Sequence, residues 1–115
     1  MTEGGSMRPQ LIEAFEDCPV IAAIKDDEGL KRCIHSDIPI VFVLYGDICN
    51  ISQIVSRLKK AGKIVIIHID LIAGLSSKEI AVTYIKSVTH ADGIISTRPS
   101  VIRQAKEEGL FAIMR

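Results

Sequence analysis

The sequence predicts an α/β fold built around a parallel β-sheet. Short apolar runs rich in Ile and Val recur along the chain, and they have the length of buried strands. Amphipathic stretches with the period of an α-helix lie between these runs, and no clear linker divides them. Strands that alternate with helices in this way pair in parallel, with right-handed crossovers.

The apolar runs supply the strands of this expected sheet. Each run is short and rich in β-branched side chains, and polar or turn-forming residues bound it. In chain order, the expected strands are residues 20–24, 39–45, 63–69, 91–96 and 110–114.

The first two helices are expected over residues 27–35 and 48–61. In the second, apolar side chains recur three and four positions apart between Ile51 and Leu58, which places them on one face. Gly62 follows, and glycine suits the left-handed conformation that often ends a helix.

The last two helices are expected over residues 76–87 and 99–108. The third begins with SSKE, residues 76–79, which has the form of a capping box. The fourth begins with a proline, which suits the first turn because the N–H groups there have no partner within the helix.

Composition limits the class of protein. The chain has 115 residues, of which 48% are hydrophobic, and its 14 basic and 14 acidic residues give zero net charge. This is the composition of one compact soluble domain, and it argues against binding to nucleic acid through a general positive field. No apolar run approaches the roughly 20 residues of a membrane span, so no membrane association is expected.

The cysteines and the amino-terminal segment give further expectations. Cys18, Cys33 and Cys49 lack metal-binding spacing, so we expect reduced thiols in a cytoplasmic protein, with no metal and no cofactor. Residues 1–18 are expected to be a flexible leader and first turn, because they open with a polar, Gly-containing stretch without a signal-peptide core. Residues 19–115 are expected to form the folded unit.

Polar residues gather at the carboxyl ends of the expected strands, where parallel α/β folds bind ligands. His68 and Asp70 alternate with Ile67 and Ile69, so the pair is expected to share one face and one mouth of the sheet. The fourth helix offers free N–H groups beside Arg98, which favours an anionic ligand. The candidate ligand-binding residues are Lys25, His68, Asp70, Ser96, Thr97, Arg98 and Arg115.

Several of these residues also have a purely structural interpretation. His68 would be a core histidine bonded to a backbone carbonyl, and Asp70 would cap the turn at Ala73-Gly74. Thr97 would cap the fourth helix. The convergence of polar residues on one end of the sheet favours a site over these separate roles.

Three stretches resemble a known family: HIDLIAG (68–74), GIISTR (93–98) and AIMR (112–115). In this order and at these separations they are similar to the glycerol-3-phosphate-responsive antiterminators, the glycerol uptake operon regulators of bacteria. The similarity runs from about Pro19 to Arg115. It implies a TIM-type barrel with the candidate residues at its mouth. It also implies a regulator, not an enzyme, that binds glycerol-3-phosphate, acts on leader mRNA and lets polymerase read through a terminator.

The chain is short for a complete barrel of this type. A (β/α)₈ barrel needs about 200 residues or more, so we expect the incomplete, amino-terminal part of the family fold, with about five strands and four helices. Its later phosphate-holding loops would be absent. Ala22, Ile24, Ile64 and Ile66 are expected on an inner face without cover, and the strand that starts at Leu110 would have an open edge. A homo-oligomer is therefore expected.

The RNA-binding surface is expected from the resemblance alone. The densest positive cluster is RLKKAGK, residues 57–63, but a helix dipole favours lysines at a carboxyl end for structural reasons. Aromatic residues make up 4% of the chain and offer no platform on which bases would stack. The weak candidates for RNA contact are Arg57, Lys59, Lys60 and Lys63.

A flavodoxin-like, doubly wound receiver of phosphoryl groups is one alternative. Asp26 and Asp27 would hold Mg²⁺, Asp70 would accept the phosphoryl group, and Ser96 or Thr97 would sense it. Against this alternative, the chain lacks a fifth helix after its last strand.

A sugar-phosphate enzyme of TIM-barrel type is the other alternative. His68 and Asp70 would act as acid and base. No second carboxylate is convincingly placed, and Lys25 is the sole candidate for a catalytic lysine.

Overall fold

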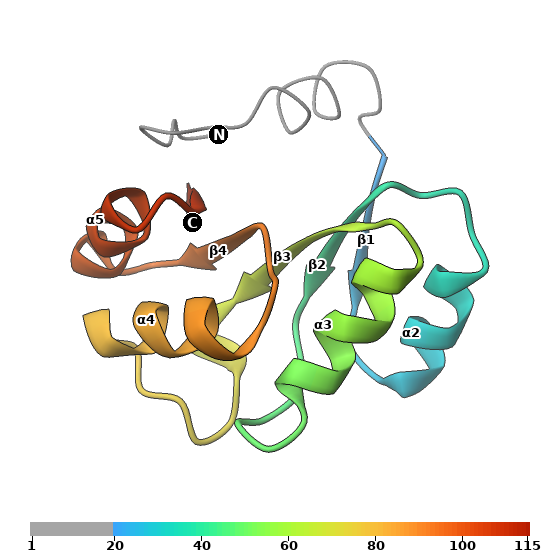
Figure 1. Ribbon diagram of the computed structural model, residues 1–115, viewed down its shortest axis with the longest axis horizontal. Coiled ribbons are helices and arrows are strands. Elements are labelled where there is room, and N and C mark those ends of the chain that lie inside the picture. The colour runs from blue at the N-terminus through green and yellow to red at the C-terminus, as the bar shows by residue number, and fades with distance from the viewer. Residues whose placement is uncertain (1–19) are drawn as a thin grey trace.

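The computed structural model describes residues 20–115, so the expected leader lies outside the described residues. Strands and helices alternate along this part of the chain, as the sequence predicts, and they are short (Figure 1). The elements are β1 (Ile21–Ile24), α2 (Asp27–Ile34), β2 (Ile40–Val43), α3 (Ile51–Lys60), β3 (Ile64–His68), the 3₁₀ turn η1 (Ile69–Leu71), α4 (Glu79–Val88), β4 (Gly93–Ser96), α5 (Pro99–Glu107) and β5 (Phe111–Met114).

The five strands form one parallel sheet in the order β1-β2-β3-β4-β5. Each strand therefore lies beside its neighbour in sequence. A flavodoxin-like sheet would reverse its winding at a switch point and place β1 inside the sheet. The doubly wound alternative is therefore wrong, and the prediction of parallel β/α units of TIM-barrel type is confirmed.

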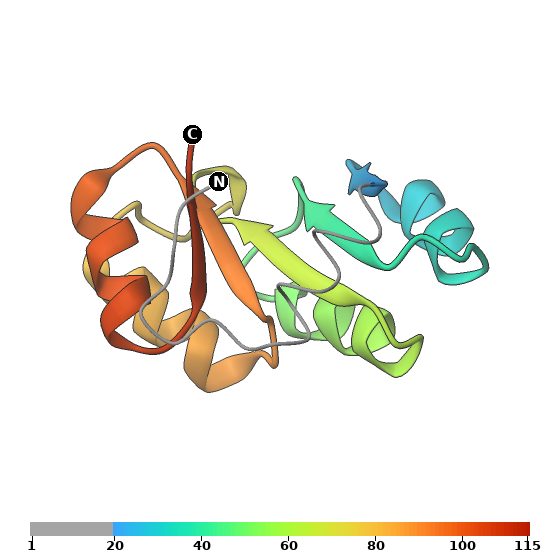
Figure 2. The ribbon, with the colours of Figure 1, turned by 90° about the horizontal axis from the view of Figure 1, so that it is seen from above.

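The four helices of the described residues pack on one face of the sheet. Figure 2 shows them along the outer side of a curved sheet, which is the arrangement of a singly wound barrel. Alternate residues of the strands pack against the apolar side of the helices. Together they form one continuous apolar core. This core includes Ile24, Val43, Ile67 and Ile94 from strands and Leu30, Leu58, Val82 and Val101 from helices.

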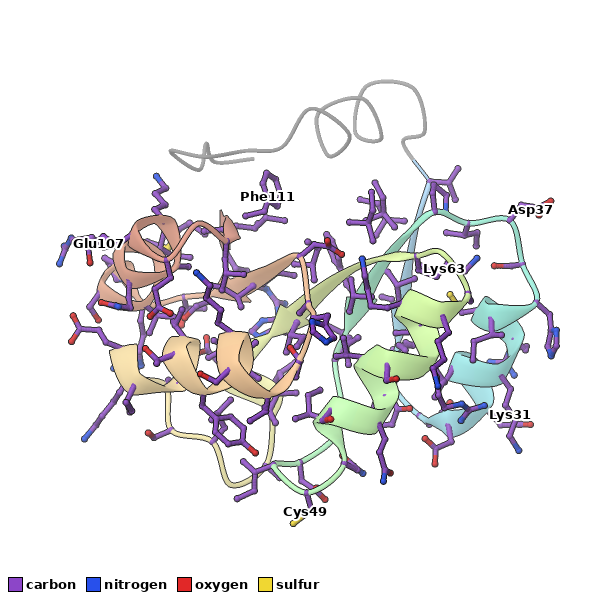
Figure 3. All side chains as sticks on the ribbon, viewed as in Figure 1. Lys31, Asp37, Cys49, Lys63, Glu107 and Phe111 are labelled. Atoms are coloured by element: carbon purple, nitrogen blue, oxygen red, sulfur yellow. The ribbon has the colours of Figure 1, made fainter. Side chains whose placement is uncertain are left out.

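The opposite, concave face carries a smaller apolar cluster. Phe111 belongs to this face and projects away from α4 (Figure 3). The cluster contains buried Ile66, Ile95 and Phe111, with half-buried Phe42, Ile64 and Ile113 packed against them.

Two expectations about the concave face are wrong. Ala22 and Ile24 pair with Val41 and Val43 and pack into the helix-covered core, because residues opposite one another in adjacent strands share a face. Ile66 does lie on the concave face, but it is fully buried there.

Helix boundaries differ from prediction where side chains form other contacts. α3 begins at Ile51 and not at residue 48, because Asp47 Oδ1 accepts hydrogen bonds from the N–H groups of Cys49 and Asn50 and holds a turn before the helix. α4 begins at Glu79, and its N-cap Lys78 makes no capping hydrogen bond with its side chain. The capping box predicted at residues 76–79 therefore does not form.

Within residues 20–115, the helices are all too short or too polar to cross a lipid bilayer.

Candidate functional site

The third strand ends at His68, because the next three residues turn into η1. The two-residue alternation of a strand places Ile64, Ile66 and His68 on the concave face, but it stops before Asp70. The expectation that His68 and Asp70 share a strand face is therefore wrong. The two side chains have different partners and contribute to different parts of the site.

Asp70 binds the turn that joins β4 to α5. Its carboxylate accepts hydrogen bonds from Ser96 Oγ at 3.0 Å, from the Thr97 N–H group at 2.9 Å and from Thr97 Oγ1 at 3.1 Å. Ser96 Oγ also accepts a bond from the Arg98 N–H group at 3.1 Å. Burial alone would raise the pKa of Asp70, but the hydrogen bonds from Thr97, Ser77 and Ser96 lower it below 3.8. Asp70 is therefore an ionised, fully engaged carboxylate at neutral pH.

His68 is 3% exposed and lies beside the end of β5. Its Nε2 atom is 3.2 Å from Nη1 of Arg115, and the Arg115 backbone N–H group binds the carbonyl of Ser96 at 3.0 Å. Burial lowers the pKa of His68 below 6.5, the Asp70 charge opposes this shift and the Arg115 charge adds to it. The imidazole is therefore neutral at pH 7.

Nδ1 of His68 is buried, and no hydrogen-bond partner for it lies within residues 20–115. Buried polar atoms are nearly always paired in native proteins, so this nitrogen needs an explanation.

A cavity of about 340 Å³ opens beside His68 on the concave face. It lies at the carboxyl ends of the strands, the edge at which parallel α/β folds bind ligands. Its volume falls within the range typical of small-molecule sites. The lining residues are Phe42, Leu44, His68, Ile95, Ile113, Met114 and Arg115.

The structure brings some candidate ligand-binding residues together and separates others. His68 and Arg115 line the cavity. Arg98 is exposed at the N-cap of α5. Lys25 is exposed after β1, at the opposite edge of the sheet from β5.

Sequence reasoning missed the apolar lining of the cavity. Phe42 pairs with Ile66 of β3, and Ile95 of β4 pairs with Ile113 of β5, all on the concave face. The alternation of side chains along each strand, read in register, would have indicated this face. Most of the lining is apolar, so a pattern of polar residues alone does not indicate it.

Two of the four RNA candidates hold the fold together. Lys59 Nζ donates to Asp92 Oδ2 at 2.8 Å. Lys63 is 5% exposed and donates to the Ser36 carbonyl at 2.6 Å (Figure 3). Arg57 and Lys60 are exposed on α3. The positive surface of the folded chain is therefore smaller than the cluster of basic residues in the sequence suggests.

The acidic residues of the receiver alternative serve other roles. Asp26 caps α2 by accepting a hydrogen bond from the Gly29 N–H group at 2.8 Å, and Asp27 accepts one from the Tyr45 hydroxyl at 2.7 Å. Burial and the bond to Asp27 raise the pKa of Tyr45. No group of three or more His, Cys, Asp or Glu side chains that would suit a metal ion occurs in the described part of the chain.

Two of the three cysteines lie in the described part of the chain. Cys33 is a buried free thiol and Cys49 an exposed one in the loop before α3 (Figure 3). Cys18 lies outside the described residues.

Comparison with known proteins finds one family and several related chains. A family model described as glycerol-3-phosphate responsive antiterminator matches residues 20–115. The uncharacterized protein YgcP of Escherichia coli (strain K12) is 48% identical over 105 residues, which are 91% of this chain and 55% of that protein.

Two solved structures have a similar fold. The glycerol uptake operon antiterminator regulatory protein of Listeria monocytogenes gives a TM-score of 0.80 at 28% identity, over 83% of this chain and 51% of that chain. A glycerol uptake operon antiterminator-related protein of Thermotoga maritima gives 0.74 at 34% identity, over 83% and 53%. The chain spans about half the length of the relatives it matches.

Proposed function

Because this chain belongs to the glycerol-3-phosphate responsive antiterminator family, we propose that it takes part in transcription antitermination in response to glycerol-3-phosphate. The observation that carries the proposal is the match of the family model over residues 20–115, which include the entire candidate site. The target in this proposal is the leader mRNA of genes for glycerol utilisation, and the protein acts in the cytoplasm as a regulator that catalyses no reaction.

The geometry of the candidate site supports an anionic effector. Arg98 is exposed at the start of α5, and a helix amino terminus attracts negative charge. Asp70 holds this turn in place through Ser96 and Thr97, so the position of Arg98 is fixed by the fold. We propose that the phosphate of glycerol-3-phosphate binds near Arg98 at the carboxyl edge of the sheet.

The geometry gives less support to a sugar-phosphate enzyme. Asp70 binds Ser96 and Thr97, and His68 contacts Arg115. The two groups thus have separate hydrogen-bond partners, and Lys25 lies at the far edge of the sheet. A candidate base has to reach the proton that it abstracts, and the Asp70 carboxylate is already bonded to Ser96 and Thr97.

Calorimetric titration of the purified chain at low salt tests the effector. We expect saturable binding of glycerol-3-phosphate, and much weaker binding of glycerol. Arg98→Ala removes a charged hydrogen-bond donor, worth about 1.5–3 kcal/mol, or roughly 10- to 150-fold in affinity. Arg103→Ala, an exposed position further along α5, is the matched control. Equal affinity of the Arg98→Ala variant and the wild type would show that Arg98 is only a surface residue.

Read-through of a terminator tests the regulatory role. A leader containing the terminator is placed before a reporter gene in cells that produce the chain. We expect read-through to rise when glycerol-3-phosphate is supplied and to stay low without the chain. Read-through that is indifferent to the chain in both conditions would contradict the proposed activity.

A further inference from the structure

Basic residues follow both outer strands of the sheet. β1 ends at Ile24 and is followed by Lys25, and β5 ends at Met114 and is followed by Arg115. Both basic residues are exposed, and no carboxylate within residues 20–115 forms an ion pair with either. Because β1 and β5 are the two ends of the strand order, Lys25 and Arg115 of one chain lie on opposite sides of the sheet.

Both basic residues continue the row of side chains on the concave face. In β1, Ile24 packs in the helix-covered core, so its neighbours Ala23 and Lys25 take the other face. The backbone is still extended at Asp26, and the alternation of the strand therefore holds as far as Lys25. Arg115 lines the cavity on the concave face. A strand beside β5 that ended as β1 does would bring the two charges together.

The two outer strands have complementary edges. The four strand pairs of the described sheet are parallel, and β1 and β5 have one neighbour each in it. The free side of β5 therefore suits a parallel strand that ends at the same mouth and is followed by a helix on the convex side. β1 is such a strand, because α2 follows it and packs in the convex core. The β1 strand of the same chain does not reach β5, since about eight strands close a barrel of this type.

A second copy of the chain fits the free side of β5. The chain spans about half the length of the relatives it matches, so two copies supply about as much chain as one relative. Pairing of β5 with the β1 strand of the partner, made twice about a two-fold axis, closes the sheet with five strands from each copy. It also covers apolar surface that is exposed at the two edges, at Val20, Ile21 and Met114. Such a barrel is wider than the usual eight-stranded one, so room for a ligand remains at its mouth.

We propose that two copies close one barrel, and that Lys25 of each copy joins Arg98 and Arg115 of the other in an anion site. The identity of the anion as the phosphate of glycerol-3-phosphate rests on the proposed function. The carboxylates that follow Lys25 have other partners, because Asp26 caps α2 and Asp27 accepts a hydrogen bond from a tyrosine. Three cationic donors suit the charge of a phosphate group. Each dimer thus carries two sites at one mouth, and neither is complete in a monomer.

Mixed dimers test the shared site by calorimetry. Lys25→Ala and Arg115→Ala are each titrated alone with glycerol-3-phosphate at low salt. We expect each to bind at least about tenfold more weakly than the wild type, because each loses a charged donor. The two variants are then unfolded together in urea, refolded and titrated again. Random pairing makes half of the dimers mixed, and each mixed dimer has one intact site, so wild-type affinity should return at about a quarter of the wild-type number of sites.

A second mixture is the matched control. Arg98→Ala and Arg115→Ala alter two residues that the same copy supplies to one site. A mixed dimer of these variants therefore has one basic residue missing from each site, and we expect no return of wild-type affinity. Recovery in this control would show that refolding, and not the sharing of residues, restores binding, and it would overturn the proposal.

Sedimentation of the wild type tests the closed assembly without a ligand. Two contacts that close the sheet limit the assembly to twice the 12.6 kDa of the chain, whereas edge pairing that does not close gives a growing series of species. We expect a dimer as the largest species at micromolar concentration. A monomer at every concentration, or a series without a limit, would overturn the closed barrel and with it the shared site.

The outcomes separate the shared site from the proposed function. If the wild type binds glycerol-3-phosphate but Lys25→Ala keeps full affinity, or the first mixture recovers no sites, the shared site is wrong and the effector stands. The same titrations with inorganic phosphate decide the converse case. Recovery of phosphate binding in the first mixture, when the wild type does not bind glycerol-3-phosphate, leaves the shared site in place and removes the effector. A wild type that binds neither compound overturns both.

Discussion

Asp70 organises the carboxyl edge of the sheet by accepting hydrogen bonds from residues that follow β4. Ser96 is fully buried, so its hydroxyl depends on the Asp70 carboxylate for a partner on that side. Thr97 contributes both its N–H group and its hydroxyl. The residue that appeared in the sequence to be a candidate ligand contact therefore also builds the turn that positions Arg98.

Replacement of Asp70 by Ala should destabilise the fold. The change leaves the Thr97 N–H group and the buried Ser96 hydroxyl without their acceptor, which costs about 1.5–3 kcal/mol. Urea unfolding followed by circular dichroism measures the loss. Asp37→Ala, at an exposed position, serves as the control and should change stability by less than about 0.5 kcal/mol. Equal unfolding midpoints for the two variants would contradict the structural role of Asp70.

The pKa of His68 makes stability depend on pH in a defined window. Burial, its largest cause, lowers the pKa below the ordinary value of 6.5, so the unfolded chain binds a proton more readily than the folded chain. Stability from this residue is thus complete above about pH 6.5 and is lost as the pH falls toward the lowered folded value. Unfolding midpoints measured between pH 8 and pH 5 should show this decline.

The matched variants isolate His68 as the source of that decline. His68→Leu does not titrate, so its unfolding midpoint should fall less over the same range. His90→Gln alters an exposed histidine, and we expect it to keep the decline of the wild type. The same slope in all three proteins would assign the pH dependence to other groups.

At the scale of elements, close packing of β4 against β5 depends on a glycine. A Cβ atom added at Gly93 would lie 2.3 Å from the carbonyl oxygen of Phe111 and 2.8 Å from its Cβ atom. Gly93→Ala therefore has to move β5 away from β4. We expect a loss of about 1–3 kcal/mol or more in the free energy of unfolding, measured by denaturant titration.

Gly62 provides the comparison for this substitution. It has a positive φ of 81°, and an added Cβ atom would meet open space. Gly62→Asn places a residue that tolerates the left-handed conformation, so its cost should be well below that of Gly93→Ala. If the two variants lose similar stability, the contact between Gly93 and Phe111 is not the cause.

Lys59 links α3 to the sheet through Asp92. The Asp92 carboxylate, whose side chain is 6% exposed, also accepts a hydrogen bond from the Val65 N–H group at 2.8 Å. Lys59→Met should cost about 1–3 kcal/mol, because a nearly buried carboxylate loses its cation. Lys60→Met, an exposed neighbour, should be nearly neutral. Thermal unfolding compares the two variants. Equal melting temperatures would show that the Lys59 charge does not stabilise the fold.

The order of elements was predictable from the sequence because each strand is a short run of buried Ile and Val. The boundaries of β3 and α4 were not. Nothing in the pattern of apolar residues shows that the chain turns after His68, since Ile69 is as apolar and as buried as the strand before it. Residues 76–79 have the sequence of a capping box at Ser76, but α4 starts three residues later, at Glu79.

The edge of the sheet that bears the candidate site was also predictable, but the hydrogen-bond partners of its residues were not. Parallel topology alone brings His68, Asp70 and Arg115 to one edge. The bond from Ser96 to Asp70 joins residues that are 26 positions apart, and that from Arg115 to His68 spans 47 positions. Such contacts depend on strand register, which a single sequence does not define.

At the scale of the whole molecule, the sheet of residues 20–115 is curved, and the helices of these residues cover its convex side. Within residues 20–115, β1 pairs only with β2, and β5 pairs only with β4. Among the described residues neither outer strand has a second neighbouring strand, and an open edge of this kind is a template for another strand. Val20 and Ile21, at 59% and 36% exposure, add apolar surface at the β1 edge.

We expect the chain to associate through the β1 edge. Sedimentation velocity over a micromolar range should show species heavier than the 12.6 kDa monomer, in a proportion that rises with concentration. Ile21→Lys places a charge on the edge strand, a device that natural sheets use against edge pairing, and it should shift the population toward monomer.

Ile80→Lys is the control, because it removes a more exposed isoleucine, at 67% exposure, from the surface of α4 instead. If both variants reduce association equally, general apolar attraction is the cause; if neither does and the wild type is a monomer at all concentrations, the β1 edge is not a contact surface. An effect confined to Ile21→Lys is what edge pairing requires, because only there does the added charge lie beside unpaired strand N–H and C=O groups.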